Sequence, residues 1–227
     1  MTGGRERGLW LDAAHHGDLA TFVERARRLD DAAVIRLRQR SDGLLAAWTA
    51  TGFDVLASRV VRGRVRPPDI SAGADALLRG LAAVDPSGVV DPGFPMDSAW
   101  RGALPPESGF VHLDDVPARA VLDLAARGVE LAKEHGAQGP PVSLLDQEVI
   151  RVGAGAAGSA TSDAAEGGAG VPMRCVFALT AMGFVSSEVA PGAADEIVRV
   201  RVLPAWLRID ARFGSVYRRR GDPLLLM

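Results

Sequence analysis

The stretch EIVRVRVLPAWLRIDARFGSVYRRRG, residues 196–221, decides how the C-terminal half of this chain folds. Apolar and polar side chains alternate along three runs in it, residues 197–203, 206–213 and 216–220. Alternation with period two is typical of strands with one buried and one solvated face, and the Gly-Ser pair at 214–215 provides a turn. The stretch therefore predicts antiparallel strands.

The same stretch is strongly basic. It holds seven arginines and two acidic residues, so its charge is +5 in a chain whose net charge is −2. Nucleic-acid phosphates or an acidic protein surface would complement this charge. The candidate contact residues are Arg199, Arg201, Arg208, Arg212, Arg218, Arg219 and Arg220.

The composition is that of a soluble globular protein. Of the 227 residues, 48% are hydrophobic and 24% charged, which is enough to build one large core or two modest ones. No apolar run approaches the roughly 18 residues of a membrane-spanning helix, and residues 1–8 do not begin a secretory signal. We expect a cytoplasmic protein with no membrane partner.

Cysteine and histidine do not predict a nucleophile or a metal centre. Cys175 is the sole cysteine and lies in an apolar run, which excludes an internal disulfide and indicates a buried thiol. His15 and His16 stand beside Asp12 and Asp18, but adjacent side chains on a helix diverge, so this group indicates the solvated start of a helix. We expect no catalytic residue, no metal site and no cofactor.

Residues 1–84 predict a first unit of helices and antiparallel strands. Asp18 caps a helix over residues 19–29, in which apolar residues recur at helical spacing. The Asp-Gly pair at 42–43 predicts a hairpin turn. The expected strands cover residues 33–40, 44–49 and 55–65, and the expected closing helix covers residues 73–84.

Residues 85–109 predict a connector. They contain five prolines and four glycines, which disfavour regular structure. We expect an ordered, irregular crossing between two units.

Residues 110–227 predict a second unit of the same kind. Its first helix is expected to be capped by Asp114 or Asp115, with Pro117 in the first turn, and to end before Gly136.

Two further helices are expected in this unit before the strands. A short one begins at Ser143, which forms an approximate capping box with Asp146, and an apolar one covers residues 173–185. Between them, residues 153–170 hold six glycines and seven alanines and predict a flexible loop.

The fold class is therefore α+β, with two helix-plus-antiparallel-sheet units joined by a Pro/Gly-rich crossing. A winged-helix form of the second unit is an alternative, because two helices followed by a basic hairpin are its parts in the right order. Against it, the apolar helix from Met173 carries Arg174 as its only charge, whereas a recognition helix presents polar side chains to the bases.

A literal G-x-G-x-x-G motif occupies residues 153–158, directly after the apolar residues 149–152. In dinucleotide-binding units, such glycines let backbone N–H groups approach a pyrophosphate. Here the residues that follow lack the apolar positions of a packed helix, and no acidic residue stands where the ribose contact belongs. A nucleotide-binding enzyme is therefore the least favoured function.

Three phrases, AVIRLRQR at 33–40, GFDVLASRVVR at 52–62 and WLRIDARFGSVYR at 206–218, resemble those of a family of uncharacterised actinobacterial proteins. The resemblance covers both ends of the chain. It implies a shared architecture and carries over no activity and no functional residues.

Together these features favour a binding or interaction protein over an enzyme. One hypothesis is a nucleic-acid-associated or regulatory protein that acts through the C-terminal arginines. The alternative is a structural, homo-oligomeric protein, because residues 71–150 carry 12 acidic and 5 basic side chains and would complement the arginines of a neighbouring copy.

Overall fold

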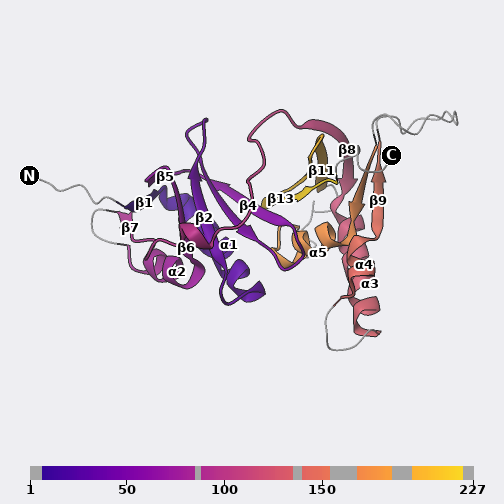
Figure 1. Ribbon diagram of the computed structural model, residues 1–227, viewed down its shortest axis with the longest axis horizontal. Coiled ribbons are helices and arrows are strands. Elements are labelled where there is room, and N and C mark those ends of the chain that lie inside the picture. Colours follow the sequence, from indigo (N-terminus) through magenta and orange to yellow (C-terminus); the bar gives the residue numbers. More distant parts are fainter. Residues whose placement is uncertain (1–6, 85–87, 135–139, 154–167, 186–195, 222–227) are drawn as a thin grey trace, which may run out of the picture. The chain divides into compact units, whose positions relative to one another are not determined.

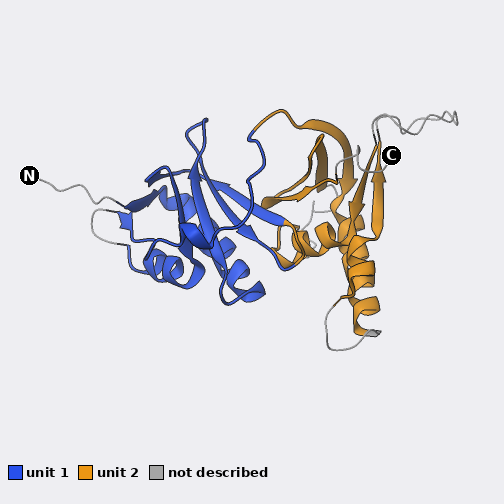
Figure 2. Cartoon of the chain, viewed as in Figure 1, with its two compact units in different colours: residues 1–52, 56–107 blue, residues 53–55, 108–227 orange. Residues whose placement is uncertain are grey.

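A computed structural model describes residues 7–84, 88–134, 140–153, 168–185 and 196–221 (Figure 1). The chain divides into two compact units, drawn in different colours in Figure 2. Unit 1 comprises residues 1–52 and 56–107, and unit 2 comprises residues 53–55 and 108–227. Each unit combines helices with antiparallel strands, as the sequence predicts.

The main sheet of unit 1 has antiparallel strands in the order β6-β2-β3-β4. The strands are β2 (Val34–Gln39), β3 (Leu45–Ala50), β4 (Leu56–Val61) and β6 (Asp69–Gly73), and the helices are α1 (Ala13–Leu29) and α2 (Ala74–Ala82). The two helices pack against each other and against the sheet. Leu19 and Phe22 of α1 and Ile35 and Leu37 of β2 are buried, so the core of unit 1 lies between this sheet and its helices.

A small second sheet in unit 1 has the order β5-β1-β7. Its strands are β1 (Gly8–Leu11), β5 (Gly63–Arg66) and β7 (Val89–Val90). The prediction of one strand over residues 55–65 is wrong, because β4 ends at Val61 and the chain then pairs with β1. Gly63 permits this pairing, since a Cβ there would lie 2.7 Å from the Trp10 carbonyl oxygen.

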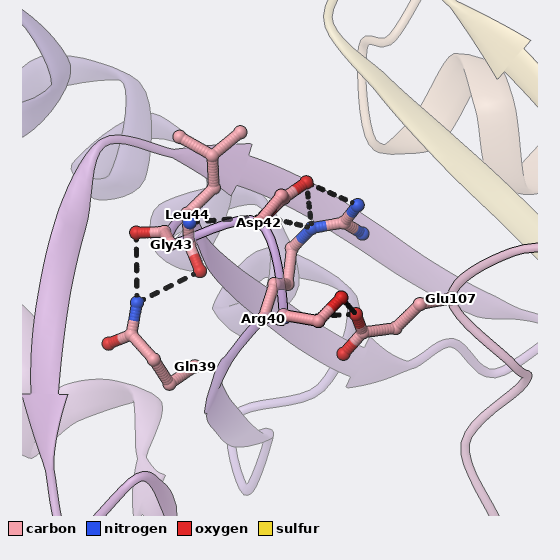
Figure 3. A network of polar contacts seen from close by, with 7 residues as sticks. Gln39, Arg40, Asp42, Gly43, Leu44 and Glu107 are labelled. Carbon is pink, nitrogen blue, oxygen red and sulfur yellow. Dashed lines mark hydrogen bonds and ion pairs between the residues drawn. The ribbon is translucent and has the colours of Figure 1, made fainter.

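Residues 96–107, which we call the strap, contact the side of the main sheet that carries its arginines. They include the short 3₁₀ helix η1 (Asp97–Ala99). The Arg36 guanidinium lies 5.6 Å from the centre of the Trp100 ring. Near the end of the strap, Glu107 accepts hydrogen bonds from the Ser41 hydroxyl at 2.8 Å and the Ser41 N–H at 3.1 Å (Figure 3).

The main sheet of unit 2 has antiparallel strands in the order β13-β12-β11-β8. The strands are β8 (Val111–Pro117), β11 (Ile197–Leu203), β12 (Trp206–Ala211) and β13 (Gly214–Arg219), and the helices are α3 (Ala118–Glu134), α4 (Val142–Asp146) and α5 (Met173–Ala181). A separate ribbon pairs β9 (Glu148–Val152) with β10 (Ala169–Pro172). Helix α5 packs against α3 and β13, and a Cβ at Gly128 of α3 would lie 2.8 Å from the Phe177 ring of α5.

The predicted helix start in unit 1 is wrong. Helix α1 begins at Ala13 with Asp12 as its N-cap residue. Asp18 therefore lies inside the helix, where its carboxylate forms an ion pair with Arg59 of β4 at 2.5 Å. Any aspartate near a helical pattern looks like a cap in sequence, and the tertiary partner of this one was not visible there.

Two predicted helix starts in unit 2 are also wrong. Asp114 and Asp115 lie in β8, which pairs with β11, and α3 begins only at Ala118. Helix α4 begins at Val142 with Pro141 as its N-cap residue, so Ser143 and Asp146 form no capping box.

The winged-helix alternative is not supported. Helix α5, which would have been the recognition helix, is buried from Met173 to Leu179. A helix enclosed on every side is a core element and presents no face to DNA. Most of the predicted flexible loop over residues 153–170 and most of the G-x-G-x-x-G motif lie outside the described residues, which omit 154–167. The end of the predicted loop is wrong, because Ala169 and Gly170 belong to β10 and pair with β9.

The two ends of the chain repeat one order of elements. At the N-terminal end the order is β1-α1-β2-β3-β4, and at the C-terminal end it is β10-α5-β11-β12-β13. Within the described residues, no helix combines the length and the apolarity needed to cross a membrane.

Candidate nucleic-acid or partner interface

The C-terminal arginines occupy both faces of the unit 2 sheet. In the register of β11 and β12, Arg199 lies opposite Asp210 and Arg201 lies opposite Arg208. Residues directly opposite in an antiparallel pair share a face. Arg199, Arg201 and Arg208 therefore lie together, and we call this the arginine face. The alternating residues Val198, Val200 and Ile209 are buried.

Asp210 is the counter-charge at the centre of the arginine face. Its carboxylate contacts Arg208 Nε at 2.7 Å and Arg201 Nε at 3.3 Å. The Ser215 hydroxyl donates a third contact to it at 2.5 Å. The Asp210 side chain is only 16% exposed, so this carboxylate largely neutralises two of the seven candidate arginines.

Aromatic rings enclose Arg208 further. Its guanidinium lies 5.5 Å from the ring centres of Phe110 and of Tyr217, and these two rings meet edge to face at 5.9 Å. Cation–π contacts of this kind contribute about 0.5–2 kcal/mol each. Arg208 is therefore a structural residue more than a free contact group.

The outer arginines of this face are more accessible. Arg199 is 50% exposed, and its nearest carboxylate is Asp115 of β8 at 4.0 Å. An exposed pair at that distance contributes little to stability. Arg219 lies opposite Trp206 and stacks over its ring at 5.6 Å.

Arg218 belongs to the opposite face. It lies opposite the buried Leu207, and its guanidinium contacts Asp146 of α4 at 3.2 Å. Arg212 and Arg220 are exposed beyond the ends of the strands. The structure therefore does not bring all seven predicted contact residues together.

Arg174, the only charged residue of the apolar helix α5, is buried and forms a polar cluster in unit 2. Arg174 of α5 donates to the Asp146 carboxylate at 2.5 and 3.1 Å and to the Phe53 carbonyl at 2.8 Å. Asp54 stands 3.7 Å away. These contacts link residues 53–55 to α4 and α5. The neighbouring Cys175 is buried, and desolvation raises the pKa of its thiol to about 12, so it stays protonated.

Sequence reasoning missed several partners of the arginines. The charge count includes Asp210 but does not reveal that it pairs with Arg208, although residues two apart on a strand share a face. Asp115 was assigned to a helix cap. Phe110 gave no signal, because it precedes its strand and contacts Tyr217 from more than a hundred positions away.

Solved structures that resemble this chain are sliding clamps. The beta sliding clamp of C. crescentus has a TM-score of 0.54 and 14% identity, over 96% of this chain and 66% of the clamp. The clamp of Bacillus subtilis has a TM-score of 0.56 and 11% identity, over 98% and 68%. The clamp of Pseudomonas aeruginosa has a TM-score of 0.53 and 10% identity, over 95% and 65%.

At such low identity these likenesses establish the fold alone, and it is a sliding-clamp fold of the α+β class. The chain spans about two thirds of the length of these clamps, 65–68%. No curated protein matches it by sequence.

Two family models match the chain. Residues 4–102 match a domain of unknown function (DUF8010), and residues 105–223 match a second domain of unknown function (DUF8185). Both agree with the expectation of an uncharacterised family, while the actinobacterial source stays a prediction. The second model covers more than half of the sequence, and this chain therefore belongs to the DUF8185 family.

Proposed function

We propose that this protein is a non-catalytic, DNA-associated protein of clamp-like architecture. The observation that carries the proposal is the likeness to sliding clamps over 95–98% of the chain, which includes both units. Two of these structures are described as DNA polymerase sliding clamps. Their descriptions associate the fold with DNA, and the same association is proposed for this chain.

Three arginines of the predicted set are the best candidates for phosphate contacts. Arg212, Arg219 and Arg220 are exposed, and within the described residues none of them forms an ion pair. Arg201, Arg208 and Arg218, by contrast, are held by carboxylates. A guanidinium that has no carboxylate partner can contact a phosphate without first breaking an ion pair.

The test is an electrophoretic mobility shift on random duplex DNA at low and at physiological salt. The variant is R212A/R219A/R220A. A matched control, R79A/R101A/R119A, removes the same charge from other exposed positions. Each phosphate contact contributes about 0.9 to the slope of log K against log salt, so the first variant should reduce the slope by about 3 and the control should not change it.

The absence of a shift by the wild type at low salt and micromolar protein would refute DNA association. Equal losses in the variant and the control would mean that binding follows total charge and that these three arginines are not the contact site.

A second candidate function, self-association, is favoured by the edge of the unit 2 sheet. Strand β8 ends the strand order, and within the described residues no further strand pairs with it. Its Val111 is 61% exposed. An open edge strand can accept a strand from another chain, so a second copy would be a suitable partner.

Sedimentation velocity over a range of concentrations tests this function. Val111→Lys should shift the population toward smaller species, because an edge lysine opposes strand addition. Val142→Lys is the control, at a residue that is 68% exposed and outside β8. A wild type that stays monomeric throughout would rule out self-association.

A further inference from the structure

A second basic surface lies in unit 1, on and beside β5. Arg62, Arg64 and Arg66 are exposed and alternate with Gly63 and Val65, of which Val65 is only 4% exposed. Alternate side chains on a strand share a face and are about 6.6 Å apart. This spacing is comparable to that of consecutive phosphates along a nucleotide strand.

These three guanidinium groups carry no counter-charge in the part of the chain that the structure describes. Within the described residues, none of them forms an ion pair. By contrast, Arg36 and Arg40 of the same unit each contact a carboxylate at 2.7–2.8 Å. The β5 surface therefore keeps its positive charge available to a ligand.

An aromatic ring lies beside this charge. Trp10 of β1 stands opposite Arg64 in the register, and Gly8 stands opposite Arg66. The Arg64 guanidinium is 4.7 Å from the centre of the Trp10 ring. A Cβ at Gly8 would lie 3.1 Å from that ring, so the glycine leaves room for the half-buried indole to lie along β1. The ring and the arginines form one surface.

The surface borders an open hollow of about 550 Å³. Its lining includes Trp10, Arg62 and Arg64 of this surface and residues 42–44 of the β2–β3 turn. Ligand sites in proteins commonly measure about 300–1,000 Å³. The hollow is therefore large enough for one nucleotide.

The β2–β3 turn that lines the hollow is held in place by Gln39. The Gln39 amide donates to the carbonyl oxygens of Gly43 at 3.0 Å and Leu44 at 3.1 Å (Figure 3). The same side chain accepts a hydrogen bond from the Val65 N–H at 3.1 Å, so it ties the turn to β5.

The acidic residue of that turn does not cancel the surface charge. Asp42 is bound by Arg40, with contacts of 2.8–3.1 Å, and by the Leu44 N–H (Figure 3). Asp12 also lines the hollow. Within the described residues its carboxylate forms no ion pair. One such carboxylate against three arginines leaves the surface with a net positive charge.

We propose that this surface binds single-stranded nucleic acid. Arg62, Arg64 and Arg66 contact successive phosphates, and an unstacked base enters the hollow and stacks against the Trp10–Arg64 pair. Sites for single strands combine a basic track with aromatic platforms in this way, and a base inside a duplex is not free to stack. The proposal does not depend on the clamp-like role, because it rests on residues of unit 1 alone.

The test is fluorescence anisotropy of the full chain with a labelled oligothymidylate, titrated at several salt concentrations. The variant R62A/R64A/R66A should bind more weakly and reduce the salt slope by about 2, since each phosphate contact on a single strand contributes about 0.7. The control R79A/R101A/R119A removes the same charge elsewhere and should leave the slope unchanged.

Trp10 provides an independent readout. Loss of one base stack costs about 1–3 kcal/mol, so Trp10→Leu should weaken binding about 5- to 150-fold without changing the salt slope. Trp10→Phe keeps a ring and should bind within a few-fold of the wild type. If Trp10→Leu fails to fold by circular dichroism, the Trp10→Phe variant and the arginine variant still test the site.

Four outcomes would overturn the proposal. They are no binding by the wild type at low salt, equal losses in the arginine variant and the control, tighter binding of a duplex of the same length, and full competition by polyglutamate. The last result would identify an acidic protein segment as the ligand instead. Failure of duplex binding in the mobility-shift experiment would leave this site unaffected.

Discussion

Strand β2 of unit 1 and strand β11 of unit 2 carry the same pattern and use it differently. Each follows a helix in the repeated order of elements, and each alternates two arginines with buried aliphatic residues. The corresponding arginines are Arg36 and Arg38 on β2 and Arg199 and Arg201 on β11. What differs is the residue opposite the first arginine of each pair, which is Trp48 in unit 1 and Asp210 in unit 2.

The carboxylate that neutralises the arginines therefore comes from a different neighbouring strand in each unit. In unit 1, Arg36 makes two contacts of 2.7 Å with Asp69 on the neighbouring strand β6, and Trp100 of the strap covers its guanidinium. In unit 2, Asp210 comes from β12 and serves two arginines. An alternating basic strand therefore does not by itself define a binding face, because its neighbours decide how much of the charge remains available.

The helices that precede these strands differ as well. Helix α1 buries one stripe and exposes the rest, whereas α5 is buried from Met173 to Leu179. A buried helix that contains Arg174 requires an internal counter-charge. Asp146 supplies it, so the buried guanidinium of unit 2 depends on a carboxylate that is itself 47% exposed.

The largest expected effect follows from that dependence. Asp146→Ala leaves the 9%-exposed Arg174 side chain without its closest carboxylate and also removes the partner of Arg218. Loss of one partner of a buried pair costs about 3–5 kcal/mol. Because Asp146 is 47% exposed and the Phe53 carbonyl remains, we expect the lower end, about 3 kcal/mol. Urea unfolding measures this loss of unfolding free energy, and amide hydrogen exchange should show reduced protection in α5. A loss below about 1 kcal/mol would contradict the dependence of Arg174 on Asp146.

Asp210→Ala tests the shared carboxylate of the arginine face. It leaves Arg201 and Arg208 opposite each other without a counter-charge, so we expect a loss of about 2 kcal/mol. The double variant D210A/R201A removes the repulsion and should recover part of the loss. If the double variant is no more stable than D210A, repulsion between Arg201 and Arg208 does not account for the loss of stability in D210A.

Asp69→Ala is the unit 1 counterpart on the edge strand. Its two-point contact with Arg36 is partly exposed, and charge-assisted contacts of this geometry contribute about 1–1.5 kcal/mol. The matching change in unit 2, Asp115→Ala, removes a 4.0 Å contact with Arg199 and a 3.4 Å contact with His112. All three side chains are exposed, so the change should cost less than about 0.5 kcal/mol. Urea unfolding compares the two variants. Equal losses of unfolding free energy would show that the shorter, two-point contact of Asp69 is no more stabilising than the contacts of Asp115.

Sequence patterns predicted the elements that depend on local residues. Strands β2, β3 and β11, the apolar helix α5 and the α+β class follow from periodicity. Patterns failed where a distant partner decides the outcome. Asp18 is held by Arg59 from another element, Asp115 is drawn into β8 by β11, and Gly63 serves the approach of β1. None of these partners is close in sequence.

The candidate site shows the same division. The basic character of residues 196–221 was evident, but alternation alone could not say which arginines are occupied. For Arg218 and Arg208 that depends on Asp146 and on Phe110, which lie more than seventy positions from these two arginines. The predicted strand over residues 55–65 includes Arg62 and Arg64 and stops before Arg66, so the sequence pattern does not reveal their basic surface beside Trp10.

The smallest expected effect concerns Glu107, which holds the strap in unit 1. Hydrogen bonds from the Ser41 side chain and backbone lower the pKa of this carboxyl group. A lowered folded-state pKa means that the ionised group stabilises the fold fully above its unfolded pKa of about 4.3. The stabilisation is lost as pH falls through the lowered value. The wild type should therefore exceed Glu107→Gln in stability by a small, constant amount between about pH 6 and 7, and the difference should shrink below about pH 4.3. A difference that grows on acidification, measured by urea unfolding at each pH, would mean that Glu107 is held in its protonated form and that the strap is fixed by its aromatic contact with Arg36 instead.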